Sequence, residues 1–118
     1  MRVLGIGCRK GVSLDEIEAA VGGFLPSGVA SVDCIASCDI KAEEAALLEF
    51  SRLHGKELRF FSSADLDAVQ APNPSERVKA QVGTASVCEA AALLASQGTL
   101  LLEKRKFGKI TLALAGKD

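Results

Sequence analysis

The chain has 118 residues, the size of one ordinary domain, and we expect a single domain over residues 1–118. Hydrophobic residues make up 48% of it, enough for a packed core, while a formal net charge of −1 without Trp or Tyr disfavours nucleic-acid binding. No apolar run approaches the ~18 residues of a spanning helix, and the run before Arg9 is too short for a secretory signal, so we expect a cytoplasmic protein without a membrane partner.

The chain opens with a short apolar strand over residues 3–6 that leads into a glycine-rich loop. Glycines let backbone N–H groups approach a ligand, and a following helix N-terminus with adjacent cations favours an anion. The predicted substrate-binding residues of this loop are Gly5, Gly7, Cys8, Arg9, Lys10 and Gly11. Because the spacing matches neither a dinucleotide fingerprint nor a P-loop, an ordinary strand-to-helix turn remains an alternative.

A first helix is predicted from the capping box of Ser13 and Glu16 to a glycine pair at 22–23. Residues 29–36 are rich in β-branched and small apolar side chains and predict a second strand, which Asp33 interrupts. An acid inside a strand either faces solvent or is functional. The second helix is predicted over residues 41–53, with Asp39 as its cap.

His54 and Gly55 end that helix, and we interpret His54 as a helix-terminal residue, with catalysis as the alternative. A third strand is predicted over residues 58–61, followed by a short helix to about residue 69. Two prolines within residues 71–75 break the chain before a helix over residues 75–82. A capping box of Ser86 and Glu89 then begins an alanine-rich helix that suits close packing against a sheet.

Two β-rich runs at 99–103 and 109–115 surround the basic segment 104–108 and predict an antiparallel terminal hairpin. Strands that are joined through helices are usually parallel. The sequence therefore predicts an α/β fold with three layers, in which helices cover both faces of a mixed sheet of about five strands.

The cysteines Cys8, Cys34, Cys38 and Cys88 fall in or beside predicted core elements, and we interpret them as small buried hydrophobes in a reducing compartment. A zinc site at Cys34 and Cys38 is the alternative. Because there is no Cys-x-x-Cys pair and the single histidine is distant, no metal and no cofactor are predicted.

Several segments taken together resemble one family. They are the loop at 5–11, Lys41 with Glu44, the phenylalanines at 60–61, the segments at 74–75, 82–83 and 86–92, and Lys104 followed by residues 110–113. In order and spacing these segments resemble CobE and the C-terminal domain of CbiG, a family of cobalamin (vitamin B12) biosynthesis.

The resemblance implies an α/β/α domain that binds or acts on a precorrin, a corrinoid tetrapyrrole. In two-domain relatives the activity is hydrolytic opening of a δ-lactone on a cobalt-precorrin, with loss of acetaldehyde. Since this chain matches only the C-terminal part, hydrolysis and the presence of cobalt in the substrate stay open. The expected partners are a precorrin or cobalt-precorrin intermediate and other enzymes of the pathway.

A precorrin is fringed with carboxylates, so its site needs cations and N–H donors around an apolar floor. Beyond the loop, the predicted substrate contacts are Lys41, Glu44, Ser86 and Lys104, and we expect the loop and the basic hairpin segment to meet over one cleft. For hydrolysis the catalytic candidates are Glu89 as base and Lys104 at the oxyanion. The bland alternatives are a capping-box role for Glu89 and a solubilising turn for the basic segment.

Two other functions stay open at this point. One is a nucleotide-binding or phosphate-binding domain that uses the glycine-rich loop, with Asp39 on a ribose hydroxyl. The other is a non-catalytic interaction module whose cationic turns contact partner enzymes.

Overall fold

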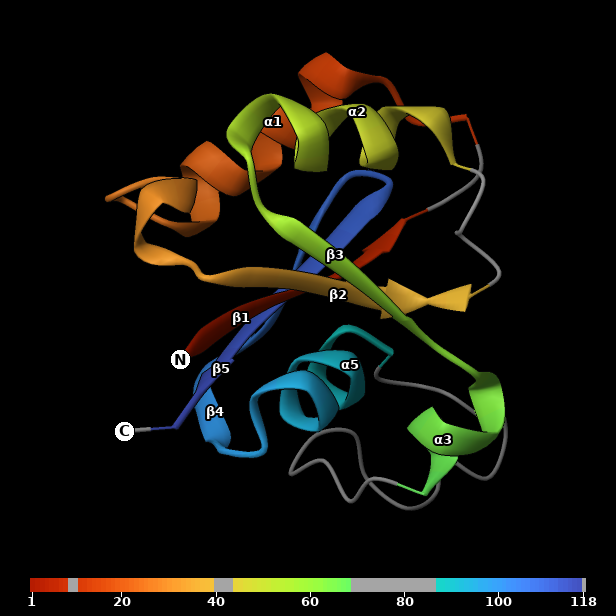
Figure 1. Cartoon of the computed structure of the whole chain (residues 1–118). Coiled ribbons are helices and arrows are strands. Elements are labelled where there is room, and N and C mark those ends of the chain that lie inside the picture. Colours follow the sequence, from red (N-terminus) through yellow and green to blue (C-terminus); the bar gives the residue numbers. More distant parts are fainter. Residues whose placement is uncertain (9–10, 40–43, 69–86, 118) are drawn as a thin grey trace.

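The computed structural model describes residues 1–8, 11–39, 44–68 and 87–117 (Figure 1). The strands are β1 (Arg2–Cys8), β2 (Cys34–Cys38), β3 (Glu57–Phe61), β4 (Thr99–Phe107) and β5 (Ile110–Gly116). The helices are α1 (Leu14–Phe24), α2 (Ala45–His54), α3 (Ser63–Asp67) and α5 (Val87–Ser96), with a 3₁₀ turn at Val29–Ser31.

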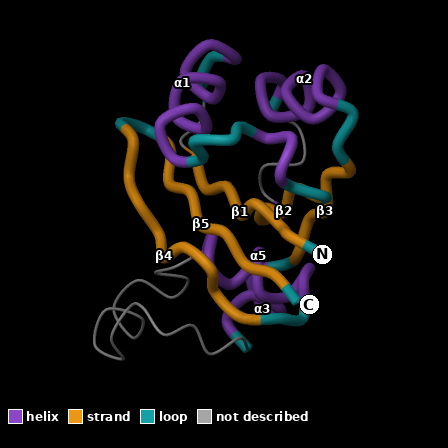
Figure 2. The backbone as a smooth tube through the Cα atoms, turned by 90° about the vertical axis from the view of Figure 1, so that its left-hand side faces the viewer, coloured by secondary structure: helices purple, strands orange, loops and turns teal. Residues whose placement is uncertain are grey.

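The five strands form one mixed sheet in the order β3-β2-β1-β5-β4. Strands β1, β2 and β3 are parallel, whereas β5 runs antiparallel to both β1 and β4. Helices α1 and α2 cover one face, and α3 and α5 cover the other (Figures 1 and 2). The predicted three-layer α/β fold with an antiparallel C-terminal hairpin is confirmed.

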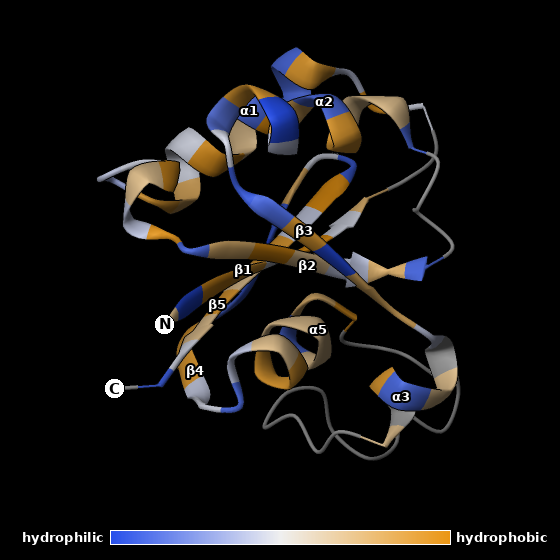
Figure 3. Ribbon diagram, in the orientation of Figure 1, coloured by the Kyte–Doolittle hydropathy of each residue, from blue (hydrophilic) through white to orange (hydrophobic). Residues whose placement is uncertain are grey.

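The two faces of the sheet have different cores. On the α1 and α2 side the buried residues are mostly large, and they include Leu4, Ile6, Ile17, Leu47 and Phe50. On the α5 side they are mostly small, and they include Cys34, Ala36, Ala91, Ala92 and Ala115. Figure 3 shows hydrophilic and hydrophobic stretches alternating along α1 and α2, whereas α5 is hydrophobic along most of its length.

The second strand starts later than predicted, so its predicted start at residue 29 is wrong. Residues Val29–Ser31 form a 3₁₀ turn, and β2 begins only at Cys34. Asp33 precedes the strand, and its carboxylate accepts a hydrogen bond from the backbone N–H of Arg2 at 2.8 Å. The backbone N–H of Asp33 also donates to the carbonyl oxygen of Arg2 at 2.8 Å, so Asp33 ties the start of β2 to β1 through both its backbone and its side chain.

The predicted cap of the second helix is also wrong. Its N-cap is Glu44, which makes no side-chain capping bond, and not Asp39. The capping box of Ser13 and Glu16 at α1 is confirmed, as is the left-handed Gly55 that ends α2. The helix predicted over residues 75–82 and the cap Ser86 lie outside the described residues.

The terminal hairpin has a tighter turn than predicted. Strand β4 continues to Phe107, so most of the basic segment is strand, and only Gly108 and Lys109 form the turn. Gly108 has a φ of 61°, which suits the first position of a two-residue hairpin turn. Lys104, Arg105 and Lys106 therefore lie in β4, one of the two outer strands of the sheet.

Candidate functional site

The carboxyl ends of β1, β2 and β3 lie at one edge of the sheet, and the hairpin turn lies at the same edge. The register requires this arrangement, because Cys8 at the end of β1 pairs with Ile110, and Ile110 pairs with Phe107. In open α/β sheets this carboxyl edge is where ligands bind. The end of the strand that enters the glycine-rich loop is thus next to the basic hairpin.

Electrostatics also connect the hairpin turn with the start of α1. The pKa of Glu16 is lowered chiefly by the hydrogen bond from the backbone N–H of Ser13, and the charge of Lys109 lowers it further. Gly11, just before this helix, has a φ of 85°, so it occupies a conformation that suits glycine.

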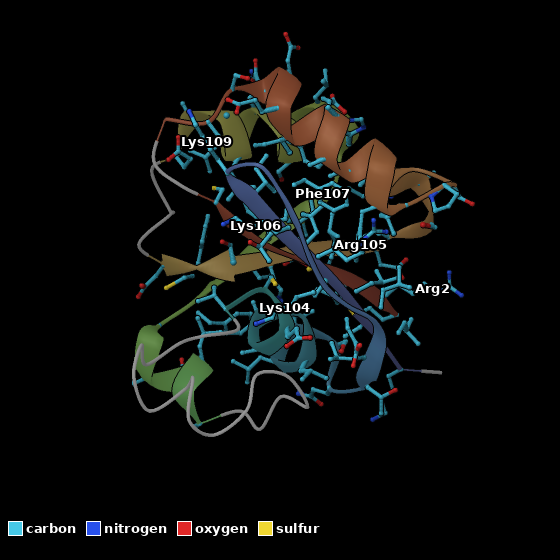
Figure 4. All side chains as sticks on the ribbon, turned by 180° about the vertical axis from the view of Figure 1, so that it is seen from behind. Arg2, Lys104, Arg105, Lys106, Phe107 and Lys109 are labelled. Atoms are coloured by element: carbon cyan, nitrogen blue, oxygen red, sulfur yellow. The ribbon has the colours of Figure 1, made fainter. Side chains whose placement is uncertain are left out.

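At this edge, a row of three paired residues crosses β1, β5 and β4 on the α5 face of the sheet. Gly7 of β1 pairs with Thr111 of β5, and Thr111 pairs with Lys106 of β4. Residues paired in this way project from the same face of a sheet. In Figure 4 Lys104 and Lys106 lie on the opposite side of β4 from Arg105 and Phe107. The row offers a bare glycine, a hydroxyl and an ammonium group side by side.

The two glycines of β1 have different surroundings. A Cβ on Gly5 would lie 1.8 Å from the carbonyl oxygen of Cys88, so the start of α5 rests directly on the strand. A Cβ on Gly7 would meet no described atom within 4 Å. Gly5 thus has a packing role in bringing α5 onto β1, and Gly7 lies where the described residues leave space beside the strand.

Glu89 makes a contact that sequence reasoning missed. The residue is 0% exposed, and its Oε2 accepts a hydrogen bond from the backbone N–H of Lys104 at 3.1 Å. The capping-box interpretation gave no reason for such a contact with β4. The available signal was an acid between apolar neighbours on an alanine-rich helix, since acids are rarely fully buried without a partner.

The thiol of Cys88, next to Glu89, is strongly perturbed. Burial, together with a smaller effect of the negative charge of Glu89, raises the pKa of Cys88 to about 12, while Lys104 acts in the opposite direction. A thiol of this kind is neutral at physiological pH and is therefore a poor nucleophile.

The remaining predicted site residues are spread over the same edge or are not described. Cys8 is half-buried and packs on the α1 and α2 side. Glu44 is half-buried at the start of α2. Arg9, Lys10, Lys41 and Ser86 lie outside the described residues. Within the part of the chain that is described, no three His, Cys, Asp or Glu residues are grouped to hold a metal ion. No helix in that part is long and apolar enough to cross a membrane.

Two surface cavities lined by described residues differ in size and place. A cavity of about 270 Å³ lies between Phe24 of α1 and the β4 segment that holds Lys104 and Arg105. A larger cavity of about 420 Å³ lies at the amino edge of the sheet, beside Arg2 and Lys117. Size favours the second, but it is far from the carboxyl ends of the parallel strands. We give more weight to the carboxyl edge. The ends of the parallel strands and the starts of α1 and α2 lie there, together with Lys106 and Lys109 of the hairpin.

Comparison with known proteins identifies relatives along almost the whole chain. The family model described as "Cobalamin synthesis G C-terminus" matches residues 2–115. The chain is 36% identical over 121 residues to Protein CobE of Sinorhizobium sp, covering 97% of this chain and 79% of that protein. It is also similar to a crystal structure of CobE, with a TM-score of 0.84 and 30% identity over 98% of this chain and 89% of the other.

A third relative is much longer. The chain is 33% identical over 116 residues to the Cobalt-precorrin-5A hydrolase of Priestia megaterium. This match covers 95% of this chain but only 31% of the hydrolase. The chain thus spans about a third of that enzyme and most of CobE. The chain belongs to the cobalamin synthesis G C-terminus family, which comprises proteins of cobalamin biosynthesis.

Proposed function

We propose that this domain binds a precorrin or cobalt-precorrin at the carboxyl edge of its sheet, on the α5 face. One observation carries the proposal, the row in which Gly7, Thr111 and Lys106 are paired at the end of β1. The ammonium group suits a peripheral carboxylate of the macrocycle. The hydroxyl supplies a hydrogen bond, and the bare glycine leaves room for the ring edge.

Charge near the start of α5 supports the same placement. The charge of Lys104 lowers the pKa of the Cys88 thiol, and the backbone N–H of Lys104 donates to Glu89 in the first turn of this helix. Lys106 lies on the same side of β4 (Figure 4). Two cations on one side of a strand suit a ligand with several carboxylates better than a ligand with one. Arg9, Lys10, Lys41, Glu44 and Ser86 remain further contacts of this proposal.

Lactone opening is a separate part of the proposal. The hydrolase relative is about three times as long as this chain, so the groups needed for turnover need not all lie here. In hydrolysis water adds to the lactone carbonyl, and the oxyanion that forms needs a donor or a cation. Lys104 is the proposed cation and Glu89 the proposed base. A non-catalytic domain that binds the intermediate is the alternative.

Binding is tested with uroporphyrin III, a stable tetrapyrrole that carries an acetate and a propionate on each pyrrole ring. We expect saturable fluorescence quenching with the wild-type chain and roughly tenfold weaker affinity for Lys106→Ala, the loss of about one charged hydrogen bond. Lys117→Ala makes the same change at the opposite edge and serves as the matched control. Equal losses in the two variants, or no saturable binding by the wild type, would contradict the proposed site.

Two further assays separate the alternative functions. Acetaldehyde release from cobalt-precorrin-5A, compared between the wild type and Glu89→Gln, tests turnover: release that only the wild type shows supports hydrolysis. Release by neither, with uroporphyrin binding retained, supports a binding domain. A thermal shift with ATP but none with uroporphyrin would favour the nucleotide hypothesis.

A further inference from the structure

The two outer strands of the sheet differ in how they expose their free edges. Strand β4 has two irregularities in its register with β5, and it carries three consecutive cations at 104–106. Irregular edges with like charges discourage pairing with a further strand. Strand β3 pairs with β2 without irregularity from Glu57 to Phe61. In Figure 2 β3 lies at the outside of the sheet, and the described part of the chain has no strand beyond it.

Two opposite charges lie on the α5 face of β3. Glu57 pairs with Cys34 and Arg59 with Ala36, and both of these β2 residues belong to the core on the α5 side. The Arg59 side chain is 46% exposed and that of Glu57 63%, and the Arg59 Nε lies 3.7 Å from the Glu57 Oε2. An exposed pair of this kind contributes little stability by itself. Both side chains are exposed enough to contact a partner strand as well.

The other face of β3 is apolar. Leu58 and Phe60 pack against the core under α1 and α2, but both remain only half-buried. Side chains directly opposite each other on paired strands lie in contact. A strand added to this edge would therefore bury more of Leu58.

Backbone geometry limits how two copies of β3 can pair. Successive residues direct their N–H and C=O groups to opposite edges, and opposed residues of an antiparallel pair are either both hydrogen-bonded or both not. Two identical edges therefore pair around a two-fold axis that passes through one residue, which faces its own copy. An axis at Glu57 or at Arg59 opposes like charges, and an axis at Phe60 leaves Glu57 beyond the paired strands. An axis at Leu58 opposes Glu57 and Arg59 twice, with two leucines between the ion pairs.

We propose that β3 is a self-association edge, at which a second copy of this chain pairs antiparallel around a two-fold axis at Leu58. The two sheets then form one continuous sheet, with reciprocal ion pairs between Glu57 and Arg59 on the α5 face. Because one short strand from each copy makes the contact, we expect a weak and reversible dimer. This dimer is independent of the proposed function, since β3 and the β4 strand that holds Lys106 lie at opposite ends of the strand order.

The test measures self-association by sedimentation equilibrium from about 10 µM to about 1 mM, the range of a weak contact, and we expect reversible dimers of the wild type. Glu57→Arg opposes cations and Arg59→Glu opposes anions, so we expect each variant to associate at least tenfold more weakly. An equimolar mixture of the two restores both pairs of opposite charge, and we expect heterodimers about as tight as the wild-type dimer. The ion pair within each chain stays broken in the mixture, so it cannot explain this recovery.

Glu49 and Arg52 of α2 provide the matched control. They also form an exposed ion pair within one element. Glu49→Arg and Arg52→Glu change the net charge by the same amounts, but on a helix instead of a strand edge. We expect both variants to dimerise like the wild type, alone and mixed. Circular dichroism checks that all four variants fold, as substitutions at exposed positions normally allow.

A wild type that stays monomeric up to about 1 mM would overturn the proposal. Dimers that persist unchanged in Glu57→Arg and Arg59→Glu would also overturn it, because they would use another surface. A mixture that recovers no association would contradict the axis at Leu58. One further measurement needs no variant: we expect hydrogen exchange of the outward β3 amides to slow as the wild-type concentration rises, while that of β4 does not change. Exchange in β3 that is independent of concentration would contradict the proposal.

Discussion

The two faces of the sheet are built differently. On the α1 and α2 side, large residues such as Leu4, Leu47 and Phe50 fill a thick core. On the α5 side, alanine, cysteine and glycine let the helix come so close that a carbonyl of α5 occupies the place of a Cβ on Gly5. The first face gains stability from apolar area. The second fixes the position of α5 through contact with the backbone, and the proposed site lies at the end of that contact.

The largest effect is expected on the α1 and α2 side of the sheet. Phe50 is fully buried, and Phe50→Ala leaves a large cavity, so we expect the free energy of unfolding to fall by about 3–5 kcal/mol. Urea denaturation measures the change. Leu53, on the same helix but 61% exposed, is the control, and Leu53→Ala is expected to have an effect within about 0.5 kcal/mol. Similar losses in the two variants would contradict the assigned core.

On the α5 side, the addition of a single methyl group is enough to disturb the packing. Gly5→Ala forces a Cβ against the Cys88 carbonyl, and we expect a loss of about 1–3 kcal/mol from overpacking, with displacement of α5. Gly7→Ala adds the same group to the same face of the same strand, in open space among the described atoms. We expect it to change stability little and to weaken uroporphyrin binding. Urea denaturation and fluorescence titration measure the two effects, and a harmless Gly5→Ala would contradict the close approach of α5.

The buried Cys88 thiol on the α5 side also makes the free energy of unfolding depend on pH in the alkaline range. The pKa of Cys88 is raised from its ordinary value of 9.0 to about 12, chiefly by burial. Between these values the unfolded chain loses the thiol proton and the folded chain keeps it. Stability that is complete below pH 9.0 is therefore lost as pH rises toward 12, by roughly 1 kcal/mol per pH unit.

The measurement is the difference between the wild type and Cys88→Ala in urea denaturation at several pH values, because lysines titrate in the same range. We expect the two curves to run parallel below pH 9 and to converge above it as the wild type loses stability. Parallel curves throughout would mean that the thiol is not held in its neutral form.

The fold could be predicted because its signals are local. The capping box at Ser13 and Glu16, the glycine that ends α2 and the alternation of strands with helices each follow from neighbouring residues. The predicted start of β2 is too early, because the β-branched residues before Asp33 are typical of a strand, although residues Val29–Ser31 form a 3₁₀ turn.

The site depends on contacts between distant residues, which spacing does not encode. The sequence indicates that Lys104, Arg105 and Lys106 are basic, but which of them shares a face with Thr111 depends on the register that the hairpin turn sets between β4 and β5. Nor does a capping-box pattern at Glu89 reveal that its carboxylate contacts Lys104 on β4. Residue types could therefore be assigned to the site from the sequence, and their orientation could not.

The most direct measurement maps where a tetrapyrrole touches the domain. In a chemical-shift titration of the labelled chain with uroporphyrin III, we expect the amides of Gly7, Lys106 and Thr111 at the carboxyl edge to shift and those of Gly98 and Thr99 at the amino edge to stay in place. Shifts confined to Gly98, Thr99 and their neighbours around the larger cavity would contradict the proposed site.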